Sequence, residues 1–181
     1  MNYRDIAVRN PELEEKMKSL GWKTDVIHIE RDFITSDNWG QVKKQVNKDG
    51  CMKILVSPSP ELMRKAVKLE ELDAVLSPQR GRKDAGMNHV IAKAAAQNET
   101  SIILSFKQVT GSRKKRMHNL SHWRTIIRLS DKYGFRIVLT TEAEQENDLR
   151  NPKDLEALLR TLEAGKELIT DNSEKTVEGY I

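Results

Sequence analysis

Cysteine and long apolar runs are both scarce in this sequence. Cys51 is its only cysteine, so no disulfide can form within the chain, which is typical of proteins from a reducing compartment. No apolar run approaches the roughly 18 residues that a membrane-spanning helix needs. Met1 is followed by Asn-Tyr-Arg-Asp rather than by a basic and then apolar signal segment. We therefore expect a soluble, cytoplasmic protein with no membrane partner.

Residues that usually carry out catalysis are also few. The histidines are His28, His89, His118 and His122, and no two of them form the His-x-His pair of a metal-binding strand. The sequence has no Gly-x-Ser-x-Gly elbow, no Walker loop and no Rossmann glycine pattern. These absences predict a chain with no catalytic residue, no metal ligand and no bound cofactor of its own. The alternative left open is a metal-dependent phosphoesterase with a reduced metal site around His28, Glu30 and His89.

Acidic residues are scarce in the middle of the chain. Between Arg80 and Arg136 there are 13 Lys and Arg residues against three acids, a net charge of +10, whereas the whole chain carries +4. Such an asymmetry is typical of a protein that binds a polyanion on one side. Aromatic residues make up only 5% of the chain, which argues against base stacking as the main mode of binding. Recognition of the backbone and shape of a folded RNA fits better, although charge alone does not separate RNA from DNA.

What the sequence does contain is a regular alternation of short apolar runs and amphipathic stretches. The predicted strands span 3–8, 23–29, 52–56, 72–76, 101–106 and 136–140, with an ambiguous further strand at 167–170. The predicted helices span 11–20, 39–47, 60–70, 87–97 and 116–132, with a last one that begins at 151. Repeated β-α units imply right-handed crossovers and a parallel sheet. We predict one α/β domain over 1–181. A TIM-barrel-like β/α barrel, irregular or incompletely closed, is favoured over an open doubly wound sheet.

The segment 77–89, SPQRGRKDAGMNH, follows a predicted strand and precedes an alanine-rich helix. In an α/β fold this is the carboxyl end of a strand, where binding sites are built. Arg80, Arg82 and Lys83 lie within four residues, among the turn-formers Pro78, Gly81 and Gly86, and glycines let the backbone approach a ligand. Cations this close repel one another unless an anion lies between them, so the pattern predicts a phosphate-recognising loop. An exposed basic turn is the simpler alternative.

This segment and its surroundings resemble a known family. The runs LDAVLSP at 72–78, RGRKDAG at 80–86 and NHV at 88–90, followed by Ala92, are similar to the central signature of ribonuclease P protein component 3. This family is the archaeal counterpart of the thirty-kilodalton subunit of eukaryotic nuclear RNase P. Further similarity lies in the strands 101–105 and 137–140, in the basic helix 117–133 and in DLRNP at 148–152. The resemblance implies a TIM-barrel-like fold related to the PHP phosphoesterases but without their full metal set.

The resemblance also implies a function and partners. It implies a non-catalytic subunit that assists a catalytic RNA in removing the 5′ leader from precursor tRNA, with magnesium used by the RNA. The implied partners are RNase P RNA, precursor tRNA, RNase P protein component 2 and the other RNase P protein subunits. A PHP-type phosphoesterase stays the alternative. The candidate RNA-binding or partner-facing residues are Arg80, Arg82, Lys83, His89, Lys107, Arg113, Arg124, Arg128 and Arg150.

Two features depart from the family pattern. Thr141-Glu142-Ala143 stands after the last main strand, where the family usually has Ser-Gly-Ala. An acid in place of glycine at this edge argues against a phosphate contact by this particular loop. The chain also has little sequence beyond Gly165, so we do not expect a regular closure of the barrel there.

Overall fold

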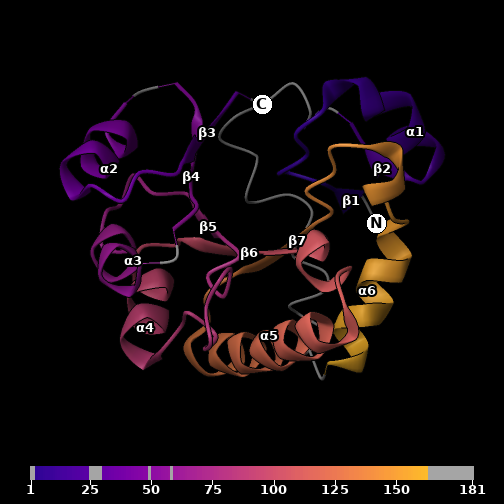
Figure 1. The fold of residues 1–181 in the computed structure, drawn as a ribbon. Helices are drawn as coiled ribbons and strands as arrows, with labels where there is room; N and C mark the ends of the chain where they lie inside the picture. Colours follow the sequence, from indigo (N-terminus) through magenta and orange to yellow (C-terminus); the bar gives the residue numbers. More distant parts are fainter. Residues whose placement is uncertain (1–2, 25–29, 49, 58, 163–181) are drawn as a thin grey trace.

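In a computed structural model, the chain is described over residues 3–24, 30–48, 50–57 and 59–162. Its centre is a five-stranded parallel sheet with the strand order β3-β4-β5-β6-β7 (Figure 1). The strands are β3 Arg31–Ile34, β4 Met52–Leu55, β5 Ala74–Leu76, β6 Ser101–Ser105 and β7 Ile137–Thr140. A separate two-stranded parallel sheet consists of β1 (Tyr3–Arg4) and β2 (Trp22–Lys23).

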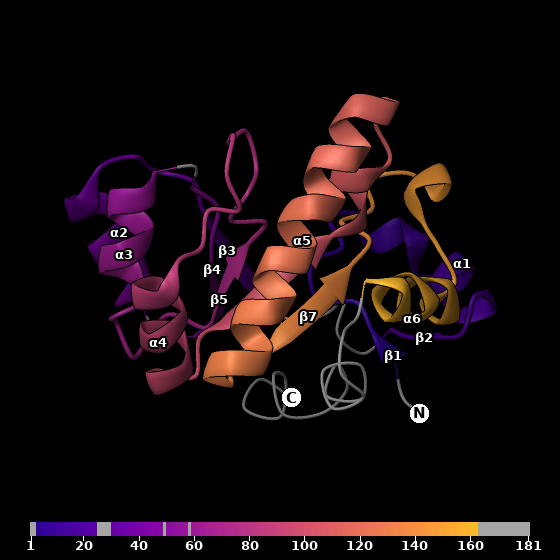
Figure 2. The ribbon, with the colours of Figure 1, turned by 90° about the horizontal axis from the view of Figure 1, so that it is seen from below.

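Helices surround the strands (Figure 1, Figure 2). The α-helices are α1 Glu14–Ser19, α2 Trp39–Val46, α3 Pro60–Ala66, α4 His89–Gln97, α5 Arg113–Tyr133 and α6 Pro152–Thr161. Short 3-10 turns are η1 Pro11–Leu13, η3 Phe106–Val109 and η4 Glu146–Asp148. The longest helix, α5, has 21 residues. Over the described residues, no helix combines the length and the apolar character needed to cross a membrane.

The α/β class and the parallel arrangement predicted from the alternation are confirmed. Every neighbouring pair in the five-stranded sheet is parallel, and a helix follows each of its strands in the chain. Among the described residues, no backbone ladder joins the two sheets, so closure of a barrel is not shown. The ambiguous strand at 167–170 and residues 25–29 of the predicted strand 23–29 lie outside the described residues.

The sequence-based prediction misses β3. Its residues Arg-Asp-Phe-Ile include two adjacent charges, so the segment lacks the apolar run that marks the other strands. β3 lies at the edge of the five-stranded sheet, where charged side chains are well tolerated. The Arg31 side chain turns towards the N-terminal segment, and its Nη1 donates to the Val8 carbonyl at 3.3 Å. Local hydrophobicity is therefore a poor guide to this strand.

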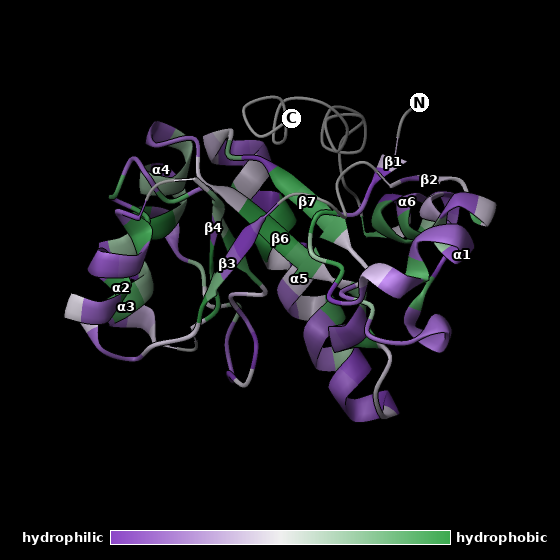
Figure 3. Cartoon of the chain, turned by 90° about the horizontal axis from the view of Figure 1, so that it is seen from above, coloured by the Kyte–Doolittle hydropathy of each residue, from purple (hydrophilic) through white to green (hydrophobic). Residues whose placement is uncertain are grey.

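Both faces of the sheet are buried, in two hydrophobic clusters. One face contributes Met52, Ile54, Ala74, Leu76, Ile103 and Val138. The other contributes Leu55, Val75, Ile102, Leu104, Ile137 and Leu139, which belong to the larger cluster with the helices. This alternation follows from the two-residue period of a strand. Figure 3 shows β6 and β7 as strongly hydrophobic, whereas β3 and the first turns of α5 are hydrophilic.

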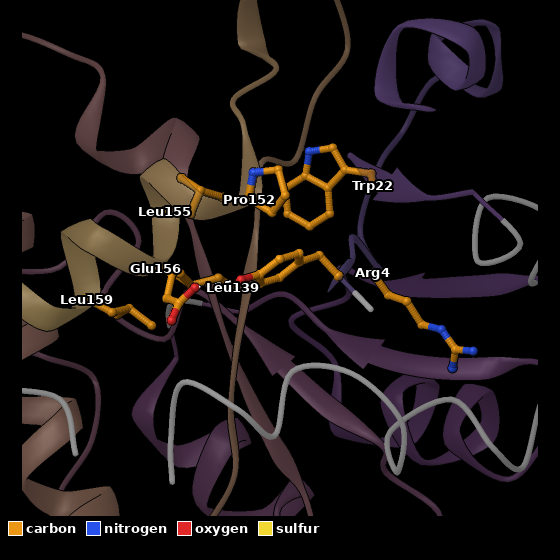
Figure 4. Close-up of a pocket in the computed structure, with 8 residues that line it drawn as sticks. Arg4, Trp22, Leu139, Pro152, Leu155, Glu156 and Leu159 are labelled. Atoms are coloured by element: carbon orange, nitrogen blue, oxygen red, sulfur yellow. Dashed lines mark hydrogen bonds between the residues drawn. The ribbon is translucent and has the colours of Figure 1, made fainter. Parts of the chain in front are cut away.

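A small enclosed cavity separates the two-stranded sheet from α6 (Figure 4). Its volume is about 10 Å³, which is close to the space of a single water molecule. Tyr3 Oη donates to Glu156 Oε2 at 2.6 Å, and Trp22 Nε1 donates to the Arg150 carbonyl at 2.8 Å. Figure 4 shows the Trp22 ring beside Pro152. We interpret this cavity as a packing gap where α6 covers the N-terminal strands.

Parallel strands bring their carboxyl ends to one edge of the sheet. β5, β6 and β7 end at Leu76, Ser105 and Thr140, so the segments that follow them begin at this edge. We call it the rim. Figure 2 shows the segment after β5 extending on the same side of the molecule as the first turns of α5. The rim therefore brings the predicted phosphate-recognising loop near the most basic part of the chain.

Candidate functional site

The basic loop 77–88 is anchored directly to the sheet. The Ser77 amide donates to the Ile103 carbonyl at 2.8 Å, which continues the pairing of β5 with β6 by one residue. Two tight turns follow, with the Arg80 amide donating to the Ser77 carbonyl at 2.8 Å and the Arg82 amide to Gln79 at 3.0 Å. Ser77 itself is buried and has a φ of 48°. The backbone of the loop is therefore compact and tied to the sheet.

Gly86 closes this loop against its own beginning. Its φ is 67°, and a Cβ atom there would lie 1.9 Å from the Pro78 carbonyl oxygen. We expect Gly86→Ala to displace the loop and to lower the free energy of unfolding by about 3 kcal/mol or more, through steric overlap and backbone strain. Gly81→Ala is the control, because Gly81 has a φ of 71° but no atom within 4 Å of its Cβ position.

Chemical denaturation of both variants measures this difference. Gly81→Ala carries only the left-handed backbone cost of about 1–2 kcal/mol. Equal losses of stability in the two variants would contradict the close packing of the loop at Gly86.

Arg82 is held by an acid of the same loop. Its Nε and Nη2 donate to Asp84 Oδ1 and Oδ2, both at 2.7 Å. Asp84 Oδ1 also accepts from the Gly86 amide at 2.8 Å. The hydrogen bond from Arg82 and then that from Gly86 hold the pKa of Asp84 below its usual value, with a further contribution from the charge of His122 on α5. Lys83 and His89 are exposed.

Arg80 points to a buried acid of another segment. Its Nη2 donates to Glu142 Oε2, while Arg9 donates to Glu142 Oε1 through Nε at 3.3 Å and Nη2 at 3.1 Å. Glu142 is 2% exposed and has a φ of 52°. Burial would raise the pKa of Glu142, but the hydrogen bond and charge of Arg80 and the charge of Arg9 outweigh it and lower the pKa. Glu142 is therefore a carboxylate shared by two guanidinium groups.

Asp5 forms a second buried acidic centre beside Glu142. It is fully buried and accepts from the Thr140 hydroxyl, the Thr141 amide at 2.8 Å and the Thr141 hydroxyl at 2.5 Å. Burial raises the pKa of Asp5, and the hydrogen bonds from Thr140 and Thr141 oppose this shift. Burial also lowers the pKa of Arg31, which the charge of Asp5 opposes. The Glu142 amide donates to Thr140 Oγ1 at 3.0 Å, so the two acids belong to one network.

Lys107 and Arg150 meet around η3. Lys107 Nζ lies 2.7 Å from Glu144 Oε2. The Arg150 guanidinium lies over the Phe106 ring at 5.1 Å from its centre. Arg150 Nη1 also donates to the carbonyls of Asn147 at 2.8 Å and Leu149 at 2.5 Å. These contacts fix the start of the segment that leads to α6.

Arg113, Arg124 and Arg128 lie on the exposed side of α5. The opposite side of the helix buries Trp123 and Ile127. At 1.5 Å per residue, Arg113 and Arg124 are about 16 Å apart along the helix axis. The predicted residues thus fall into three groups, on the rim loop, around η3 and along α5. Their contacts with RNA or protein remain predictions.

A model of the family described as RNase P subunit p30 matches residues 14–179. The chain belongs to this family. Ribonuclease P protein component 3 of Methanocaldococcus jannaschii is 36% identical over 124 residues, which cover 67% of this chain and 53% of the relative. Ribonuclease P protein component 3 of Methanothermobacter thermautotrophicus is 30% identical over 154 residues, covering 81% of this chain and 63% of the relative. The matches thus span between half and two thirds of these relatives.

A solved structure supports the fold of this p30 family member. A chain of the cryo-EM structure of archaeal Ribonuclease P with mature tRNA matches with a TM-score of 0.84 and 22% identity. The match covers 99% of this chain and 90% of that chain. At this identity the likeness concerns the fold. Together with the family match, it is consistent with the TIM-barrel-like architecture predicted from the resemblance.

Sequence reasoning did not identify the buried partners of the p30 rim. Asp5 and Arg9 were not among the predicted site residues, and Glu142 was noted only as a departure from glycine. Asp5 is one of two adjacent charged residues in the predicted strand 3–8, and this is the one sequence signal that marks it. The partners of these residues come from distant segments, which no local motif reveals.

The residues of the alternative metal site are only partly described. His28 lies outside the described residues, and Glu30 and His89 are exposed. Across 3–24, 30–48, 50–57 and 59–162, no group of three or more His, Cys, Asp or Glu side chains is placed to hold a metal ion. The His118 and His122 rings on α5 lie 6.3 Å apart, centre to centre.

Proposed function

We propose that this chain is a protein subunit of ribonuclease P that assists the catalytic RNA in removing the 5′ leader from precursor tRNA. The family match over residues 14–179 carries the proposal. Its proposed partners are RNase P RNA, precursor tRNA, RNase P protein component 2 and the other protein subunits. The named relatives and the archaeal ribonuclease P structure support this assignment.

In this proposal the chain contributes positive charge on a rigid frame, and the RNA with its magnesium ions performs the cleavage. Lys83, Arg113 and Arg124 are the exposed cations that would contact phosphates. Arg80 and Arg82 have a different main role, because Glu142 and Asp84 bind their guanidinium groups. These two arginines fix the shape of the loop that presents Lys83.

The test is reconstitution of cleavage at low magnesium concentration. RNase P RNA, precursor tRNA and component 2 are combined with and without this chain. We expect the chain to raise the rate of 5′-leader removal. An unchanged rate would contradict the proposal. A stoichiometric transition metal in the purified chain, together with turnover of a generic phosphodiester, would instead support the phosphoesterase alternative.

Single charge removals should weaken RNA binding in a predictable way. We expect Lys83→Ala, Arg113→Ala and Arg124→Ala each to reduce the magnitude of the log–log salt slope of binding by about 0.7–0.9, because each removes one phosphate contact. Filter-binding titrations of RNase P RNA at several salt concentrations measure this slope. Lys44→Ala is the matched control, since Lys44 is exposed on α2, and α3 and α4 lie between α2 and α5 (Figure 1). A slope that changes equally in all four variants would contradict the assignment.

A further inference from the structure

A groove opens between η3, the first half of α5 and α6. Its volume is about 330 Å³, which lies at the lower end of the range for ligand pockets. Phe106, Val109, Leu120 and Leu158 form its apolar floor, and Arg116 and Arg150 stand beside it. This is far more space than the cavity of about 10 Å³ under α6. The groove is large enough for one or two large side chains.

The floor of the groove is hydrocarbon from three separate segments. Val109 is buried, while Phe106, Leu120 and Leu158 are partly buried and pack against the main core. Thr110 also lines the groove, but its hydroxyl donates to the Lys107 carbonyl at 2.9 Å. An occupant that buries apolar surface here gains free energy in proportion to the area removed from water. The floor therefore selects an apolar group.

The charge beside the groove is positive, and no carboxylate of the described residues pairs with it. Arg116 Nη2 donates to the Gly111 carbonyl at 3.5 Å, and Arg150 Nη1 donates to two carbonyls. Within the part of the chain that the structure describes, neither guanidinium forms an ion pair with a carboxylate. Arg80, Arg82 and Lys107 each have such a partner. A guanidinium group binds carboxylate with high geometric specificity, so the occupant should carry acids beside its apolar group.

We propose that this groove docks a segment of another protein subunit, which presents a Leu- or Phe-sized side chain flanked by Asp or Glu carboxylates. The inference rests on the proposed membership of a ribonucleoprotein. A nucleobase is a poorer occupant, because the floor offers its polar edges almost no hydrogen-bonding side chains. One ring face of Phe106 is also occupied by Arg150. An acidic apolar segment satisfies both the floor and the two arginines.

Photo-crosslinking identifies the occupant directly. The full chain carrying Thr110→p-benzoylphenylalanine is assembled with RNase P RNA and the RNase P protein subunits of the same organism, and then irradiated. We expect a crosslink to a protein subunit. Val90→p-benzoylphenylalanine is the control, because Val90 is 43% exposed on α4 and does not line the groove. A crosslink to RNA, to this chain itself, or none above the Val90 control would overturn the inference.

Matched charge variants test separately the two features of the groove, its positive charge and its apolar floor. Arg116→Glu should weaken binding of this chain to the other protein subunits about tenfold or more, as for a central interface residue. Lys114→Glu, at an exposed position of the same helix that does not line the groove, should weaken it much less. Leu158→Glu should behave like Arg116→Glu, and Ala157→Glu, at an exposed neighbouring position, should not. Thermal unfolding checks that each variant is folded. Because Arg116 is exposed, Arg116→Glu should fold and still test the groove if Leu158→Glu does not fold.

Equal effects at positions 114 and 116 would overturn the proposed docking in the groove and indicate general electrostatic attraction. The proposed function has a separate readout, which is incorporation of the unaltered chain into the particle. If the unaltered chain is incorporated but Arg116→Glu and Leu158→Glu do not weaken its binding to the other protein subunits, only this inference is overturned. A chain that is not incorporated overturns the proposed function and this inference with it.

Discussion

Replacing Glu142 by alanine should lower the free energy of unfolding by about 2–3 kcal/mol at neutral pH. The carboxylate is buried and binds two guanidinium groups, Arg9 and Arg80. Removing one partner of a buried ion pair usually costs about 3–5 kcal/mol. The loss is smaller here, because the two arginine side chains are 29% and 33% exposed and can turn towards water. Urea denaturation measures the difference.

The Glu142 contribution should also depend on pH with a defined sign. The pKa of Glu142 is lower in the folded chain than its ordinary value of about 4.3. Its stabilisation is therefore fully present above about pH 4.3 and is lost as the pH falls through the lower folded pKa. The difference between the unaltered chain and Glu142→Ala should be constant near neutral pH and should shrink on strong acidification.

Two further variants separate charge from backbone strain. Glu142→Gly also loses the carboxylate, but glycine accepts the φ of 52° without strain. It should be more stable than Glu142→Ala by about 1 kcal/mol. Glu144→Ala removes the exposed partner of Lys107 and should cost less than about 1 kcal/mol. If Glu142→Ala were no more harmful than Glu144→Ala, the buried network would have no energetic importance.

Glu142 also explains how this rim differs from a simple phosphate-binding loop. The family resemblance gives glycine at this position, where no carboxylate would compete for the neighbouring cations. Here the carboxylate binds Arg80 and Arg9 within the chain. Glu142, which stands where the family usually has glycine, thus acts as an internal counter-ion for these two arginines. In the proposed function, exposed cations outside this network, such as Lys83 and Arg113, are the ones expected to contact phosphates.

The strands with uniform apolar runs could be predicted from the sequence, and the others could not. Residues 52–55, 101–105 and 137–140 are buried on both faces, so continuous hydrophobicity marks them. β3 was missed because an edge strand can carry adjacent charges such as Arg31 and Asp32. A hydrophobic pattern indicates which residues are buried. It therefore predicts a strand only where that strand is buried in the sheet, and not at an exposed edge.

The candidate site was predictable in position but not in its internal contacts. Turn chemistry and the end of a strand place the loop 77–89 at the rim. The partner of Arg80, Glu142, lies 62 residues away, and Asp5 lies 135 residues from Thr140. A local motif shows which cations are present. Which of these cations pairs with an acid of the same chain depends on the fold. This is why Arg80 and Arg82 looked equivalent to Lys83 in the sequence.

Replacing Asp5 by alanine should lower the free energy of unfolding by about 3–4 kcal/mol. Asp5 accepts from Thr140 and from the amide and hydroxyl of Thr141, all of them buried. Donors left without an acceptor cost about 1–3 kcal/mol each, and Arg31 would lose the nearby negative charge. Denaturation at pH 7 measures the loss. Asp37→Ala, at an exposed position, is the control and should lie within about 0.5 kcal/mol of the unaltered chain.

The pH dependence of the Asp5 contribution should be opposite to that of Glu142. Burial raises the folded pKa of Asp5 above the ordinary value of about 3.9, so the folded chain binds the proton more tightly than the unfolded chain. The part of its stabilisation that depends on protonation is fully present below about pH 3.9 and declines as the pH rises through the folded pKa. The hydrogen bonds that Asp5 accepts are the contribution measured at pH 7. Asp5→Asn, which keeps one acceptor oxygen and cannot ionise, should therefore approach the unaltered chain in stability as the pH rises. A gap that widens with rising pH would show that the Asp5 carboxylate is stabilised as an anion, with Arg31 outweighing the cost of burial.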